Sequence, residues 1–128
     1  MFLITTADQR FWKTDTKTLF LGEWCLLYSQ KHVWSQLDHE VSPYHWDDRE
    51  KLYRDYQLLD QIYESFLDQL AKQLNQLHKT DFPTRYWRIV VGPWLFYFIE
   101  ILYDRYLSIC AVEKSGKVSN VLLPVPDS

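Results

Sequence analysis

The sequence predicts an α/β fold in which helices dominate and surround a small, parallel sheet of two or three short strands. A short β-branched and apolar run near the N-terminus is typical of a buried strand. A long stretch from about residue 48 to 78 has the apolar spacing of an amphipathic helix. An aromatic run after Gly92-Pro93 is apolar on every side, so we expect a buried helix there, wrapped by the rest of the fold.

Composition bounds the domain count and the class of partner. A chain of 128 residues fits one domain, and 47% hydrophobic with 17% aromatic residues is enough for a core. The formal net charge of −3 lacks the lysine and arginine excess of a phosphate-binding surface. We therefore expect no nucleic-acid partner.

The cysteines and the N-terminus indicate the compartment. Cys25 and Cys110 are two and far apart, which gives neither a disulfide framework nor a metal-binding spacing. Residues 1–8 lack the positive region and the apolar length of a signal peptide. We expect reduced thiols and a cytoplasmic protein, with contact at the inner face of the membrane as a further expectation.

Two acidic residues follow the first two predicted strands. Residues 2–6 form the first strand, with Asp8 just beyond it, and residues 19–22 form the second, with Glu23 just beyond it. In open α/β sheets ligands bind beyond the carboxyl ends of strands. Asp8 is therefore a substrate-binding candidate, although a turn-forming aspartate also explains it. The sequence contains no glycine-rich phosphate loop, and no cofactor is expected.

The stretch from Leu37 to Arg49 concentrates chemically able side chains. These residues could bind a divalent metal or act as acid and base, but their spacing matches no zinc or hydrolase signature: His39, Glu40, His45, Asp47 and Asp48. Helix capping is the alternative, with Asp47 as cap and Glu50 completing a capping box. Capping does not explain His45 beside Trp46, so His45 is the better candidate for a ligand contact.

Arg85 and Arg88 lie three residues apart and hence on one helix face. This pair could bind a phosphate or carboxylate through bidentate hydrogen bonds, or it could form ion pairs with acidic residues of the long helix. Thr84 can cap their helix. A second helix should run from Pro93 to about Ile109, and residues 118–125 could form a last strand.

Three motifs resemble the N-terminal part of a family of transferases from bacterial O-antigen and surface-carbohydrate gene clusters. They stand in the matching order and contain unusual tryptophans: Leu19-Phe20-Leu21-Gly22-Glu23-Trp24-Cys25, Tyr44-His45-Trp46-Asp47-Asp48-Arg49-Glu50-Lys51, and Arg85-Tyr86-Trp87-Arg88-Ile89 with Gly92-Pro93-Trp94-Leu95. The match covers roughly residues 2 to 109, and members of that family are several times longer. The resemblance implies that this single domain is the N-terminal part of a longer glycosyltransferase-like protein.

The resemblance also implies a set of site residues. A sugar-nucleotide transferase needs positive groups for the donor phosphates and a carboxylate or histidine to activate the acceptor hydroxyl. The resemblance makes His45 and Asp48 the catalytic candidates, and it adds Glu23, Arg49, Arg85 and Arg88 to Asp8 as substrate-binding candidates. The implied partners are a nucleotide-sugar donor and a carbohydrate acceptor.

The hypothesis is thus a transferase segment of surface-polysaccharide or O-antigen biosynthesis that is inactive alone. The rival hypothesis is a non-catalytic interaction or membrane-docking domain that uses exposed aromatic residues. A metal-dependent hydrolase is a more distant alternative. In the transferase hypothesis His45, Arg85 and Arg88 should converge on one pocket.

Overall fold

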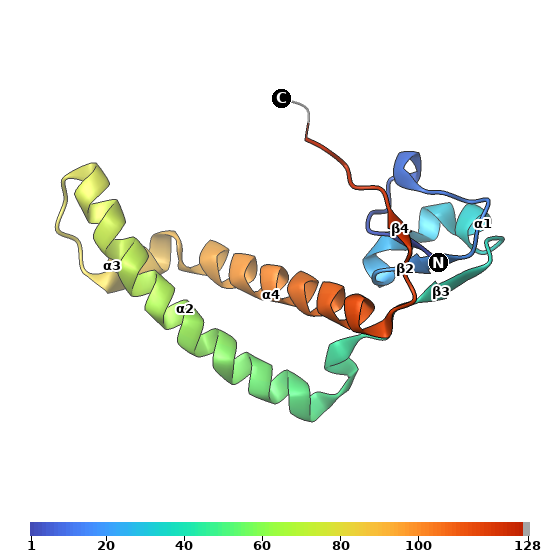
Figure 1. Ribbon diagram of the computed structural model, residues 1–128. Helices are drawn as coiled ribbons and strands as arrows, with labels where there is room; N and C mark the ends of the chain where they lie inside the picture. The colour runs from blue at the N-terminus through green and yellow to red at the C-terminus, as the bar shows by residue number, and fades with distance from the viewer. Residues whose placement is uncertain (127–128) are drawn as a thin grey trace. The chain divides into compact units, whose positions relative to one another are not determined.

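The structure, a computed structural model, describes residues 1–126 and divides into two compact units (Figure 1). The sheet unit consists of Met1–Tyr44 together with the chain from Tyr106 onward. The helical unit is the intervening segment, His45–Arg105. The division falls within the last helix, α4 (Gly92–Ser115).

The sheet unit is built on four short strands that are all parallel. They are β1 (Phe2–Ile4), β2 (Thr18–Phe20), β3 (His39–Val41) and β4 (Asn120–Val121). Their order is β3-β2-β1-β4, with Leu3 opposite both Leu19 and Val121. The predicted small parallel sheet is confirmed, but with four strands in place of two or three. The strand missed was β3, because its sequence His39-Glu40-Val41 has too few apolar residues to indicate one.

Both faces of this sheet are covered, as a parallel sheet requires. On one face Phe2, Ile4 and Phe20 form a core with Cys25. Because successive side chains of a strand point to opposite faces, Leu19 and Leu21 lie on the other face. There they pack against Val112 of α4.

Short helical elements and tryptophans close the first face. Between β1 and β2 lies the 3₁₀ turn η1 (Gln9–Phe11), and between β2 and β3 lie η2 (Glu23–Cys25), η3 (Tyr28–Gln30) and helix α1 (Lys31–Trp34). Trp12, Trp24 and Trp34 pack from these segments onto the core. Cys25 and Cys110, both among the described residues, form no disulfide bond.

The helical unit contains the 3₁₀ turn η4 (His45–Asp47), α2 (Arg49–His78), α3 (Thr84–Val90) and most of α4. The predicted long helix is confirmed almost to the residue. Its cap differs from the prediction, because Asp48, not Asp47, accepts hydrogen bonds from the amides of Glu50 and Lys51. Thr84 does not cap α3 either, since its hydroxyl bonds to Asp68 of α2.

The expectation of a buried aromatic helix is wrong. Of the aromatic run, Leu95 is buried, whereas these α4 side chains are 49–63% exposed: Trp94, Tyr97, Phe98, Ile101 and Leu102. The main apolar cores lie against the sheet, and α4 meets α2 along one side through large side chains such as Tyr63 and Phe96, whose rings stand edge to face at 5.7 Å. An apolar run that looks buried in sequence can thus be half covered.

Candidate functional site

The carboxyl ends of β1, β2 and β3 lie at one edge of the sheet, because parallel strands share their direction. We call this the carboxyl edge and define it by the residues that follow these strands: 5–8, 21–23 and 42–43. The amide of Leu21 bonds to the carbonyl of Ile4, and that of Ser42 to the carbonyl of Phe20. The predicted candidates Asp8 and Glu23 are therefore on neighbouring connections at the same edge.

Asp8 holds a local turn and an arginine. Its carboxylate accepts from the backbone amide of Arg10, as cap of η1, and from the Arg10 guanidinium at 2.6 to 3.0 Å. The hydrogen bond from Arg10 lowers the pKa of Asp8. These contacts are those of a turn-forming aspartate, one of the two interpretations of Asp8 from the sequence. The arrangement also brings a cation, the 82% exposed side chain of Arg10, to the carboxyl edge, which sequence reasoning had missed.

Glu23 is the exposed first residue of η2, directly after Gly22. A Cβ atom at Gly22 would collide with the ring of Trp24. The glycine is therefore required by close packing of an indole on the backbone. That packing fixes the turn that presents the Glu23 carboxylate outward from the edge.

Glu40, on β3, lies between two lysine side chains. It is 2.9 Å from Lys17 Nζ and 3.3 Å from Lys117 Nζ, and these hydrogen bonds, that of Lys17 foremost, lower its pKa. Glu40 also lines a hollow of the sheet unit, together with apolar and hydroxyl-bearing side chains: Leu19, Ser42, Val112 and Ser115. The acid that looked like a metal ligand in the sequence is neutralised by cations from distant parts of the chain.

His45 makes a close pair with Asp104 within the helical unit. Its Nε2 lies 2.9 Å from Asp104 Oδ1, and the two side chains are 8% and 13% exposed. The other carboxylate oxygen of Asp104 accepts from Arg105 at 2.8 Å. A carboxylate that orients a histidine is also an element of catalytic sites, but here both groups are largely covered.

Beside this pair the indole of Trp46 donates to the carboxylate of Asp55 at 2.9 Å. Lys51 Nζ approaches the same oxygen at 3.1 Å. Burial raises the pKa of Asp55, but the hydrogen bonds from Trp46 and Lys51 outweigh burial and bring that pKa below its ordinary value. Trp46 and Asp55 thereby fasten η4 to the first turns of α2.

The helical unit does not gather the other predicted site residues around His45. Asp48 caps α2, Arg49 is exposed beside it, and Arg88 is tied to Glu64. Glu64 lies fifteen residues beyond Arg49, which is about 22 Å along a helix. The expected convergence of His45 with Arg85 and Arg88 on one pocket is therefore wrong within this unit.

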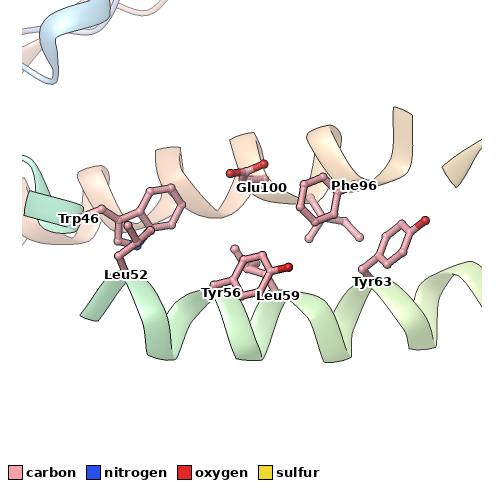
Figure 2. Close-up of a pocket in the computed structure, with 8 residues that line it drawn as sticks. Trp46, Leu52, Tyr56, Leu59, Tyr63, Phe96 and Glu100 are labelled. Atoms are coloured by element: carbon pink, nitrogen blue, oxygen red, sulfur yellow. The ribbon is translucent and has the colours of Figure 1, made fainter. Parts of the chain in front are cut away.

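A narrow pocket lies between α2 and α4 (Figure 2). Figure 2 shows Trp46 at one end, Tyr63 and Phe96 at the other, and Glu100 on α4. Its lining is aromatic and aliphatic apart from the Glu100 carboxylate and the tyrosine hydroxyls: Trp46, Leu52, Tyr56, Leu59, Tyr63, Phe96, Ile99 and Glu100. The pocket is thus a narrow cleft in the side-chain packing between α2 and α4.

Among residues 1–126 no group of three or more histidine, cysteine, aspartate or glutamate side chains is placed to hold a metal ion. The five residues that the sequence offered as possible metal ligands are divided between the units. His39 and Glu40 lie on β3, whereas His45, Asp47 and Asp48 belong to the helical unit. Over the same residues no helix has the length and apolarity needed to cross a membrane.

A family model described as "LIC12162 family transferase" matches residues 1–128. No curated protein and no solved structure matches the chain.

Proposed function

Because the chain belongs to the LIC12162 family of transferases, we propose that it is the N-terminal segment of a glycosyltransferase-like enzyme of bacterial surface-polysaccharide or O-antigen biosynthesis. In this proposal the carboxyl edge of the sheet contacts the nucleotide-sugar donor. The segment binds the donor but does not turn it over alone.

The observation that carries the proposal is the strand order. An all-parallel sheet in the order β3-β2-β1-β4 has the arrangement of the first four strands of a doubly wound nucleotide-binding fold. In such folds the ligand lies beyond the carboxyl ends of the strands, next to the first strand, where the direction of strand addition reverses. Here that point is the end of β1, which leads into Asp8 and Arg10.

The residues at this edge suit a nucleotide sugar. The carboxylates of Asp8 and Glu23 can accept hydrogen bonds from ribose or sugar hydroxyls. Asp8 engages Nε and Nη2 of Arg10, so Nη1 of the same guanidinium is the donor that can bind a phosphate oxygen. In the transfer, an acceptor hydroxyl forms a bond to the anomeric carbon, the bond from that carbon to the phosphate oxygen breaks, and the nucleotide leaves. A base takes the hydroxyl proton.

The helical unit supplies the remaining candidates for the acceptor. His45, oriented by Asp104, is the candidate base, with Asp48 beside it as a weaker one because its carboxylate already caps α2. The exposed Arg49, which follows Asp48, is the candidate for an anionic acceptor. Arg85 is exposed as well, but it lies one turn from Arg88 on α3 and so away from His45. Arg88 is the weakest, since Glu64 already occupies its guanidinium.

Thermal unfolding with a panel of nucleotides and nucleotide sugars tests the proposal. A ligand at a hundred times its dissociation constant stabilises the folded chain by about 2.7 kcal/mol, which moves the midpoint visibly. We expect one nucleotide class to raise the midpoint, and Glu23→Gln to reduce the shift while Glu113→Gln, a change at an exposed acid of α4, does not. A midpoint that no nucleotide moves would contradict the proposal.

The second candidate function is a non-catalytic interaction domain. The observation that favours it is the exposed apolar surface of α4. An interaction domain would tolerate Glu23→Gln and His45→Gln in its binding assays, but would lose binding when the exposed aromatic residues of α4 are changed.

A further inference from the structure

The helical unit leaves one face of α4 apolar and uncovered. We call it the α4 face and define it by Trp94, Tyr97, Phe98, Ile101 and Leu102, which recur at intervals of three and four and so lie on one side of the helix. Their exposed fractions are 60%, 63%, 49%, 55% and 59%. A contiguous patch of this kind marks an interaction site.

We propose that the α4 face is the interface of a homodimer, in which the same face of a second copy packs against it around a twofold axis. This proposal is independent of the proposed function. It rests on the area, the charge and the aromatic anchors of the face.

The area suits a dimer. Large side chains of 150 to 250 Å² that are about half exposed give on the order of 600 Å² for the five together. Two copies would then bury about 1,200 Å², the lower end of the range for stable, specific interfaces.

The charge pattern favours a second copy over a membrane surface. In a twofold interface each patch meets itself, so any charge at its centre meets a like charge. The α4 face contains no side chain that is charged at neutral pH, and Glu100 of the same helix lies in the cleft toward α2. A helix that lies on a membrane needs lysine or arginine beside its apolar face. No basic residue stands between Trp94 and Leu102, and the next one along α4, Arg105, is paired with Asp104.

The face also carries a preformed anchor. The rings of Trp94 and Phe98 stack with their centroids 5.2 Å apart and their planes within 17°. A rigid pair of aromatic side chains loses little conformational freedom on binding, and such residues dominate the energetics of interfaces.

Sedimentation velocity of the full 128-residue chain over a concentration series tests the proposal. We expect a monomer–dimer equilibrium that Phe98→Asp weakens about tenfold or more, because the variant buries a charge against its own copy. The matched control is Phe66→Asp on α2, where a phenylalanine of similar exposure (53%) lies outside the α4 face and should leave the equilibrium unchanged. Ile101→Asp is the second variant, used if Phe98→Asp loses its helical circular dichroism.

Three outcomes would overturn the proposal. They are a monomer at all concentrations, self-association that both α4 variants leave unchanged, and association that Phe66→Asp weakens equally. Flotation with vesicles that contain anionic lipid is run in parallel. A monomer that binds vesicles through Phe98 would assign the face to a membrane and likewise overturn the dimer.

Discussion

The guanidinium of Arg88 meets the carboxylate of Glu64 through two parallel hydrogen bonds, Nη1 to Oε1 at 2.8 Å and Nη2 to Oε2 at 2.7 Å. This bidentate pair joins α3 to α2, and the Arg88 guanidinium also lies 5.8 Å from the ring centre of Tyr63. The pair accounts for one of the two arginines that the sequence offered as phosphate ligands. It leaves Arg85 as the exposed one.

Replacing Arg88 by lysine should lower stability modestly. The two side chains are 42% and 50% exposed, so loss of the forked geometry should cost up to about 1 kcal/mol. Urea unfolding at low salt measures the loss, with Arg85→Lys as control. If both variants unfold at the same urea concentration, the pair contributes nothing.

Asn75 should be the most sensitive polar residue of the helical unit. Its Oδ1 accepts from the Phe82 amide, the Thr80 hydroxyl and the Trp87 indole, each at 3.0 Å, and its Nδ2 donates to the Phe82 carbonyl. Asn75→Ala would remove these four hydrogen bonds, two of them partly buried and two exposed, at a cost of about 1–2 kcal/mol. The neighbouring exposed Gln76→Ala is the control, and equal midpoints in chemical unfolding would refute the network's role.

Gly92 should not tolerate a methyl group unless Tyr63 changes with it. A Cβ atom at Gly92 would lie 2.7 Å from the hydroxyl of Tyr63 and 3.3 Å from Arg88 Cγ. We expect Gly92→Ala to destabilise by about 1–2 kcal/mol through overpacking, and Tyr63→Phe to recover part of that loss. A double-mutant cycle in urea measures the coupling, and strict additivity would show that the close approach is not the cause.

Asp55 should make the free energy of unfolding depend on pH in the acid range. The pKa of Asp55 is lowered in the folded chain relative to its unfolded value of about 3.9. Its contribution is therefore present above pH 4 and is lost as the pH falls through the folded pKa. The stability difference between the wild type and Asp55→Asn should shrink from pH 7 to pH 3, whereas for Gln57→Ala, a change at an exposed and uncharged residue of the same helix, it should stay constant. An undiminished difference for Asp55→Asn at pH 3 would contradict this.

The long helix α2 and strands β1 and β2 could be predicted because their signals are local. The repeat of apolar residues from Leu52 to Leu77 and the run Phe2-Leu3-Ile4 specify periodicity without reference to distant parts of the chain. The partial exposure of α4 could not be predicted, because a continuous apolar run does not say how many sides its neighbours cover.

The candidate site shows the same division. The positions of Asp8 and Glu23 past strand ends follow from the sequence, and both lie at the carboxyl edge. The pairing of His45 with Asp104, and of Glu40 with Lys17 and Lys117, joins residues far apart in the chain. Spacing in the sequence does not predict contacts between residues so far apart in the chain. The prediction that His45, Arg85 and Arg88 share one pocket was wrong for this reason.

The measurement that tests the central claim most directly is mapping of amide chemical-shift changes in the labelled 128-residue chain during titration with the nucleotide sugar that stabilises it most. The account predicts that the largest changes fall on residues 5–10 and 22–23, at the carboxyl ends of β1 and β2. Changes confined to the helical unit around Arg85, or no saturable changes at all, would contradict the assignment of the donor to the carboxyl edge.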